Sequence, residues 1–217
     1  MDTGYLSQVS SFNSASALVI ILGVNLTITL IHIVQEWKGA EVPFWRVLGA
    51  IVGVCVPHRH GFALFTLGLL AALWLAALVG IAGLFGCLLG ALGSPWGPRL
   101  GVASLGFIIG GRISDSIVSH WRLYGAGYRP NPGLSSTALY VLEAMFLLWA
   151  FRKGLLGSPL ATMVGLALGA LLFVAVLPSL RVLRRKKPDL RREPWLPWRP
   201  LPAWTKDPDC SPSAARP

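Results

Sequence analysis

Two histidines and a glutamate stand near the ends of long apolar segments. His32 and Glu36 close the segment 17–37, and His120 closes the segment 100–121. An ionisable side chain within an apolar helix costs roughly 2.5–3.5 kcal/mol on membrane-insertion scales, so each of these groups needs a partner or a role. Because His32 and Glu36 are four residues apart, they share one face of a helix.

Two imidazoles and a carboxylate are suitable ligands for zinc or iron, and they can also exchange protons as general acid and base. We therefore predict a divalent metal site formed by His32, Glu36 and His120, in which Glu36 and His120 are also the catalytic groups. The alternative is that these side chains are only solvated by lipid headgroups at the helix ends.

A second group of polar residues precedes His120 in the same segment. Arg112 and Asp115 are three residues apart, which predicts a structural ion pair between them. Asp115 and His120 are five residues apart, about 140° around an α-helix, so they are not expected to bind the same metal ion.

The remaining polar residues of the apolar segments have less specific patterns. Glu143 lies midway along its segment, where either a neutralising partner or a functional proton would explain it. His58 and His60 are expected in a solvated loop from which they could add ligands. Three further side chains are predicted to hydrogen-bond to the ligands: Asn25, Gln35 and Ser116.

The segments that position these residues are those of a membrane protein. Of the 217 residues, 54% are hydrophobic and 13% are charged, with a mean hydropathy of +0.62, whereas soluble domains carry about 25% charged residues. The composition predicts an all-α, polytopic transmembrane bundle over residues 17–180. The bundle would have about five spans and one short interfacial helix: 17–37, 62–92, 100–121, 134–151 and 159–180, with 44–56 as the interfacial helix. Glycines four residues apart, Gly106 with Gly110 and Gly165 with Gly169, predict close helix packing.

The two ends of the chain differ from the bundle. Residues 1–16 form a polar lead, and residues 181–217 form a Pro/Trp-rich tail with ten basic and four acidic residues. We predict a disordered tail that contacts the bilayer through anionic lipid headgroups. No motif for reading nucleic acid accompanies the charge, so a nucleic-acid partner is not expected. The three cysteines show no spacing typical of a disulfide framework.

The basic tail also predicts the orientation. Positive residues are retained in the cytoplasm, which places the protein in the cell membrane as a multi-pass protein with its N-terminus outside and its C-terminus cytoplasmic. The first and third of five spans then run in the same direction. His32, Glu36 and His120 would therefore lie at a similar depth, near the cytoplasmic interface.

The segment His32-Ile33-Val34-Gln35-Glu36 resembles the His-x-x-Glu-Glu signature of the HXXEE membrane-domain family. The loop Tyr128-Arg129-Pro130-Asn131-Pro132-Gly133 after His120 is similar to the Tyr-x-Pro-Gly-type loop of that family. The chain departs from the pattern at Gln35, which replaces the first Glu, and in two extra loop residues. The family has no settled activity, and the resemblance implies only that His32, Glu36 and His120 belong together.

Three functions are compatible with these patterns. The first is a metal-dependent enzyme that acts on a lipid-like substrate at the cytoplasmic interface. The second is a small proton-coupled transporter that uses Glu143, Asp115 and Arg112. The third is a membrane scaffold without catalysis, whose polar groups only lock the helices together. Convergence of the histidines would favour the first, a polar path through Glu143 the second, and separately paired polar groups the third.

Overall fold

The computed structural model describes residues 14–39, 42–57, 93, 96–174, 176–196, 198–207 and 209–210. The predicted span 62–92 and most of the polar lead lie outside these ranges. His58 and His60 also lie outside the described residues.

Helices account for the fold, and the described residues include no strand beyond an isolated bridge between Val54 and Arg191. The predicted all-α class is confirmed. In chain order the elements are α2 (Ser14–Gly39), α3 (Phe44–Val52), α5 (Trp96–Ser114), the π-helix η1 (Asp115–Trp121), α6 (Arg122–Gly125), α7 (Leu134–Ala150), α8 (Arg152–Gly157), α9 (Pro159–Val174), α10 (Val176–Lys186), and the 3-10 helices η2 (Pro188–Leu190) and η3 (Ala203–Lys206).

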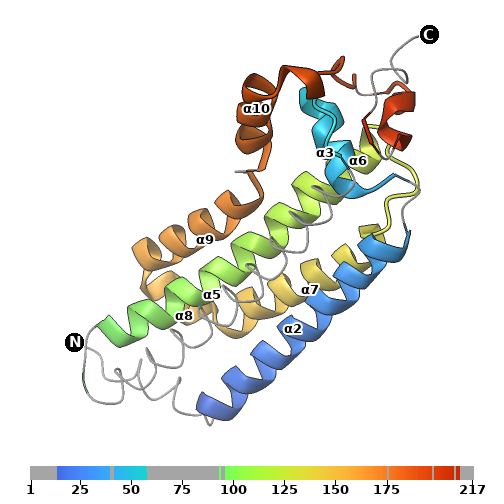
Figure 1. Cartoon of the computed structure of the whole chain (residues 1–217). Coiled ribbons are helices and arrows are strands. Elements are labelled where there is room, and N and C mark those ends of the chain that lie inside the picture. The colour runs from blue at the N-terminus through green and yellow to red at the C-terminus, as the bar shows by residue number, and fades with distance from the viewer. Residues whose placement is uncertain are drawn as a thin grey trace.

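Four helices, α2, α5, α7 and α9, lie side by side and form the bundle (Figure 1). α2 and α5 run in the same direction, and we call the end at which both finish the histidine end. The short helix α3 and the chain beyond α9 lie at this end (Figure 1). α2 packs against α7, and α5 packs against both α7 and α9.

The contact between α5 and α9 depends on glycine. A Cβ atom on Gly106 would lie 2.8 Å from the carbonyl oxygen of Thr162, and one on Gly110 would overlap the carbonyl oxygen of Leu166. Likewise, a Cβ atom on Gly165 or Gly169 of α9 would overlap a backbone carbonyl oxygen of α5. The two predicted glycine pairs therefore face each other, and their missing side chains let the two backbones touch.

Within the residues that the structure describes, one continuous helical stretch, Arg99–Gly125, is long and apolar enough to cross a membrane. It has 27 residues and contains an 18-residue window with a mean hydropathy of 1.3. Leu134–Ala150 and Pro159–Leu171 are apolar but shorter. The predicted fifth span to Leu180 is too long, because α9 ends at Val174 and α10 leaves it at an angle (Figure 1).

The histidine end carries a second, smaller packing unit, which we call the cap. It consists of α3 with the chain that follows it to Cys55, and of the described chain from Lys187 to Cys210. Its core includes Val47, Trp195 and Trp204. Arg46 of α3 is only 1% exposed and donates hydrogen bonds to the carbonyl oxygens of Thr205 and Asp207. Burial lowers the pKa of Arg46.

Two predictions about the tail differ from this packing. We expected residues 181–217 to be disordered, but their described part is folded onto α3 because Trp195 and Trp204 bury their rings there. We also expected no disulfide, whereas Cys55 and Cys210 form one with their Cα atoms 5.8 Å apart. The two cysteines are 155 positions apart in the sequence, so no argument from local spacing could predict their pairing.

Candidate metal centre

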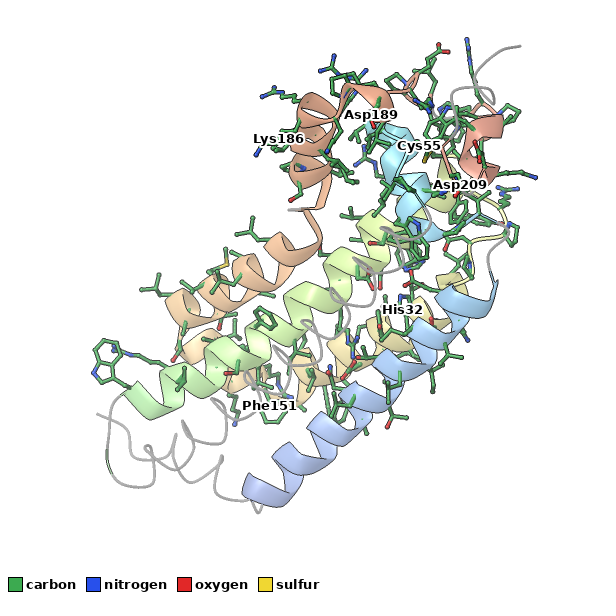
Figure 2. The ribbon with its side chains drawn as sticks, viewed as in Figure 1. His32, Cys55, Phe151, Lys186, Asp189 and Asp209 are labelled. Carbon is green, nitrogen blue, oxygen red and sulfur yellow. A yellow bond between two sulfur atoms is a disulfide. The ribbon has the colours of Figure 1, made fainter. Side chains whose placement is uncertain are left out.

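The histidine end brings together ionisable side chains from two elements. His32 and Glu36 come from the last turns of α2, while Asp115 and His120 come from η1. His32 is 4% exposed, Asp115 6% and His120 0%. Figure 2 shows His32 inside the bundle, beneath the cap.

The π-helix explains why Asp115 belongs to this group although an α-helix would have excluded it. A π-helix forms i→i+5 hydrogen bonds, so residues five apart lie about one turn from each other. The π-helix places Asp115 and His120 one turn apart on the same face, and the Nε2 atom of His120 lies 4.0 Å from Oδ1 of Asp115. The prediction that they are poor joint ligands is therefore wrong.

The four groups surround one point. The two Nε2 atoms of His32 and His120 are 3.1 Å apart. Oδ2 of Asp115 is 3.4 Å from Nε2 of His32. Oε1 of Glu36 is 3.4 Å from Nε2 of His120 and 3.7 Å from that of His32. A tetrahedral ion with bonds of about 2.0–2.1 Å would hold its ligand atoms roughly 3.3–3.4 Å apart. The candidate ligand atoms of His32, Asp115 and His120 all lie within 4.8 Å of one another, so these three could hold an ion.

Outer hydrogen bonds fix the tautomer of His120. Nδ1 of His120 lies 2.7 Å from Oδ1 of Asn131, and Nδ2 of Asn131 donates to the carbonyl oxygen of His120. Because this second bond orients the amide, its oxygen faces the ring, and Nδ1 of His120 must carry the proton. The Nε2 atom of the neutral ring then carries a lone pair and can accept a hydrogen bond or bind a cation.

The same reasoning applies to His32. The hydroxyl of Ser136 donates to the carbonyl oxygen of Gly133 and lies 2.6 Å from Nδ1 of His32. Since its hydrogen is already used, Ser136 accepts from Nδ1, and Nε2 of His32 is also a lone pair. Two Nε2 acceptors and two carboxylates therefore face one another, an arrangement that either a bound cation or a proton on one of these groups would satisfy.

Close packing holds both rings in position. A Cβ atom on Gly133 would overlap Cε1 of His120 and lie 2.7 Å from Cε1 of His32, so only glycine fits there. The ring of Phe44 in α3 stacks on His120 at 5.9 Å, and that of Tyr140 lies 4.7 Å from His32. Phe44 thereby links the cap directly to the candidate centre.

The loop before α7 is tied to the chain before α3. Tyr128 is buried in this loop and donates a hydrogen bond of 2.9 Å to the carbonyl oxygen of Val42. Burial, and secondarily the charge of Glu36, raise the pKa of Tyr128 above its usual range. The phenol therefore stays protonated and keeps donating this bond.

A separate buried network of hydrogen bonds, centred on one ion pair, lies deeper in the bundle. Arg112 pairs with Glu143 through an Nε–Oε2 contact of 2.8 Å, and Asn25 donates to the other carboxylate oxygen at 3.0 Å. Arg112 also donates to Thr29 and lies over the ring of Tyr140. The predicted Arg112–Asp115 pair is therefore wrong, because Glu143 of α7 is the partner of Arg112.

Sequence reasoning also assigned the hydrogen-bond partners of the ligands wrongly. Asn25 binds Glu143, Gln35 accepts from Ser135, and Ser116 donates to the carbonyl oxygen of Arg112. The actual partners, Asn131 and Ser136, come from the loop before α7 and its first turn. Only the neighbouring Pro-Gly pattern hinted at that loop.

Comparison with protein-family models, curated proteins and solved structures finds no match. The resemblance to HXXEE membrane domains stays a prediction that rests on the quoted residues.

Proposed function

We propose that this chain is an integral membrane protein with a divalent metal centre, zinc or iron, that serves an enzyme reaction on a lipid-like substrate. The observation that carries the proposal is the pair of imidazole Nε2 atoms 3.1 Å apart beside two carboxylates. His32, Asp115 and His120 would hold the ion, a two-histidine, one-carboxylate set that leaves a coordination position open.

Glu36 is the residue best suited to act on a molecule at that open position. Its Oε1 atom is within 3.7 Å of both Nε2 atoms, close enough to a bound water to exchange a proton with it. A metal lowers the pKa of its bound water, and a carboxylate base can then take the proton at neutral pH.

The outer surface supports a bilayer location. The polar side chains of Ser136, Thr137 and Glu143 in α7 are buried. Large apolar side chains on α7 and α9 are exposed: Leu142 at 61%, Met145 at 60%, Trp149 at 66%, Leu160 at 78% and Met163 at 63%. A soluble protein rarely exposes such a continuous apolar face. Lipid acyl chains would cover it.

The surroundings of the centre support an amphipathic substrate. Ile31 and Val34 flank His32 and are 42% and 45% exposed, and Trp121 next to His120 is 50% exposed. A molecule that approaches the centre from the side would first meet these apolar groups. A lipid with its polar head at the histidine end fits this environment.

The two alternatives have less support. A proton path through Glu143 is disfavoured because Arg112 and Asn25 already occupy both of its oxygens. A membrane scaffold without catalysis would account for the buried hydrogen bonds among Arg112, Glu143 and Asn25. It would not account for two histidines with their lone pairs turned toward each other.

The test is the metal content of the full chain purified in detergent without added metal, measured by inductively coupled plasma mass spectrometry. We expect about one zinc or iron ion per chain, and loss of that ion in His32→Ala, His120→Ala and Asp115→Asn, because each variant removes one of three ligands. Glu36→Gln should retain it. The control Asp189→Asn removes an exposed carboxylate in η2 and should leave the content unchanged.

Two results would contradict the proposal. One is a wild-type protein without bound metal that also fails to take up zinc or iron on addition. The other is metal content that is equal in the wild type and in both histidine variants.

A further inference from the structure

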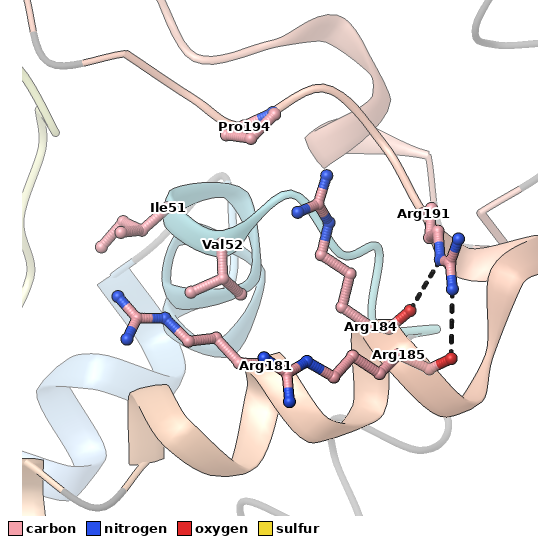
Figure 3. A pocket seen from close by; sticks show the side chains of 7 residues that line it. All are labelled: Ile51, Val52, Arg181, Arg184, Arg185, Arg191 and Pro194. Carbon is pink, nitrogen blue, oxygen red and sulfur yellow. Dashed lines mark hydrogen bonds between the residues drawn. The ribbon is translucent and has the colours of Figure 1, made fainter.

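A hollow of about 470 Å³ lies between the cap and α10, where α10 crosses α3 (Figure 3). Its charged lining consists of four arginines: Arg181, Arg184, Arg185 and Arg191. Its apolar lining comes from Ile51, Val52 and Pro194. Neither the metal centre nor the proposed reaction accounts for this site.

No negative charge from the described residues balances these arginines. None of the four forms an ion pair with a carboxylate in the part of the chain that the structure describes. Like charges gathered at one hollow repel each other, and an anion between them would remove that repulsion. The hollow therefore has the charge of an anion site.

Two of the guanidinium groups are held in place by the backbone. Arg184 donates through Nε to the carbonyl oxygen of Gly53 at 3.2 Å. Arg191 donates to the carbonyl oxygens of Arg184 and Arg185 at 2.9 and 3.1 Å, as the dashed lines in Figure 3 show. Each keeps further N–H groups for a ligand, and their orientation is set before the ligand arrives.

The other two arginines are available in full. Arg181 and Arg185 are one helical turn apart on α10 and are exposed. Neither side chain forms a hydrogen bond with a described residue, so all their N–H groups can turn to a ligand. Planar guanidinium groups bind phosphate oxygens in pairs, which makes phosphate the anion that this lining fits best.

The position of α10 relates the hollow to the membrane surface. α10 directly follows the apolar helix α9, and its residues Leu177, Leu180 and Leu183 pack against the short stretch of Val52, Val54 and Val56. The basic side of α10 then stands at headgroup level beyond the acyl chains.

We propose that this hollow is a binding site for a phosphate group, carried either by a lipid headgroup or by a small soluble molecule. Binding there involves α10, α3 and the tail together.

The experiment uses the full chain in detergent and native mass spectrometry, with two probes in separate arms: dioctanoyl phosphatidic acid and inorganic phosphate. The test variant is Arg181→Gln with Arg185→Gln, which leaves the backbone hydrogen bonds of Arg184 and Arg191 intact. The matched control is Lys186→Gln with Lys187→Gln, which removes the same charge from adjacent exposed positions outside the hollow.

We expect saturable binding that weakens about ten-fold or more in the arginine variant, because charge-assisted hydrogen bonds are lost, and by less than about two-fold in the lysine control. Binding in the lipid arm alone assigns the phosphate to a headgroup, and binding in both arms shows that the phosphate group suffices. No saturable binding in either arm, or equal weakening in both variants, would overturn the site. Metal content, measured on the same samples, should be the same in all of them, so this test stands apart from that of the metal centre.

Discussion

At the scale of single residues, the decisive feature is the protonation state of two histidine rings. Asn131 and Ser136 each hold a proton on an Nδ1 atom, and both Nε2 atoms are left as acceptors facing each other at 3.1 Å. A buried acceptor without a donor costs about 1–3 kcal/mol. A bound cation would satisfy both acceptors and both carboxylates, so we expect metal binding to stabilise the fold as well.

Removal of the amide of Asn131 should weaken the metal site without touching a ligand. In Asn131→Ala the ring of His120 loses the acceptor that fixes its tautomer, and we expect a 10–100-fold loss of zinc affinity, about the usual effect of such outer partners. Competition with a chromophoric chelator measures it. Ser135→Ala removes a nearby exposed hydroxyl that donates a hydrogen bond to Gln35, and the zinc affinity of this variant should match the wild type. Equal affinities in all three proteins would contradict the assigned role of Asn131.

Sequence reasoning reached part of this site. The i, i+4 spacing of His32 and Glu36 and the common direction of two segments were enough to bring them to His120. The presence of Asp115 in the site could not be predicted, because a rotation of 100° per residue holds only for an α-helix. No residue type in this segment indicates the π-helix η1.

At the scale of elements, the bundle is fixed where α5 and α9 touch through their glycines. The ridge of one helix has no side chains at Gly106 and Gly110, and the other helix fills that space with backbone. The spacing of four residues in both segments predicted such a contact, although not which helix would be the partner.

Gly110→Ala should destabilise the protein. Its Cβ would overlap the carbonyl of Leu166, which is backbone and cannot rotate away, so we expect a cost of about 1–3 kcal/mol and a lower thermal unfolding midpoint in detergent. Gly101→Ala in the same helix meets open space and should be neutral or slightly stabilising, since alanine is the better helix former by up to about 1 kcal/mol. Equal midpoints for the two variants would show that this contact is absent.

The elements were predicted better at their starts than at their ends. Predicted starts at 17, 44, 134 and 159 lie within three residues of α2, α3, α7 and α9, because Pro, Gly and polar breaks mark them. The predicted end of the fifth span was wrong, since the sequence stays apolar to Leu180 although α9 ends at Val174. Packing of the tail tryptophans on α3 depends on contacts between distant segments, which composition does not encode.

At the scale of the whole molecule, the disulfide joins the two ends of the cap and bears on its location. Disulfides persist in oxidising compartments, so the Cys55–Cys210 bond favours a histidine end that faces away from the cytoplasm. The basic residues of the tail favour the opposite side. The redox state of Cys55 and Cys210 therefore tests the predicted orientation. Reduced cysteines would support a cytoplasmic C-terminus, and a disulfide would favour the opposite side.

Thiol counting on the full chain tests the disulfide. The chain has three cysteines, and pairing of Cys55 with Cys210 leaves Cys87 as the remaining thiol. Denatured protein treated with a polyethylene-glycol maleimide should gain one adduct without reductant and three after reduction. Cys210→Ser should gain two adducts in both conditions. Three adducts on the wild type before reduction would contradict the disulfide and support a cytoplasmic cap.

X-ray absorption at the edge of the bound metal decides whether His32 and His120 bind the same ion. If they do, the spectrum of the wild-type protein will show nitrogen and oxygen neighbours at about 2.0–2.1 Å, together with the multiple-scattering pattern of two imidazoles. A spectrum with sulfur neighbours or without imidazole scattering would contradict it.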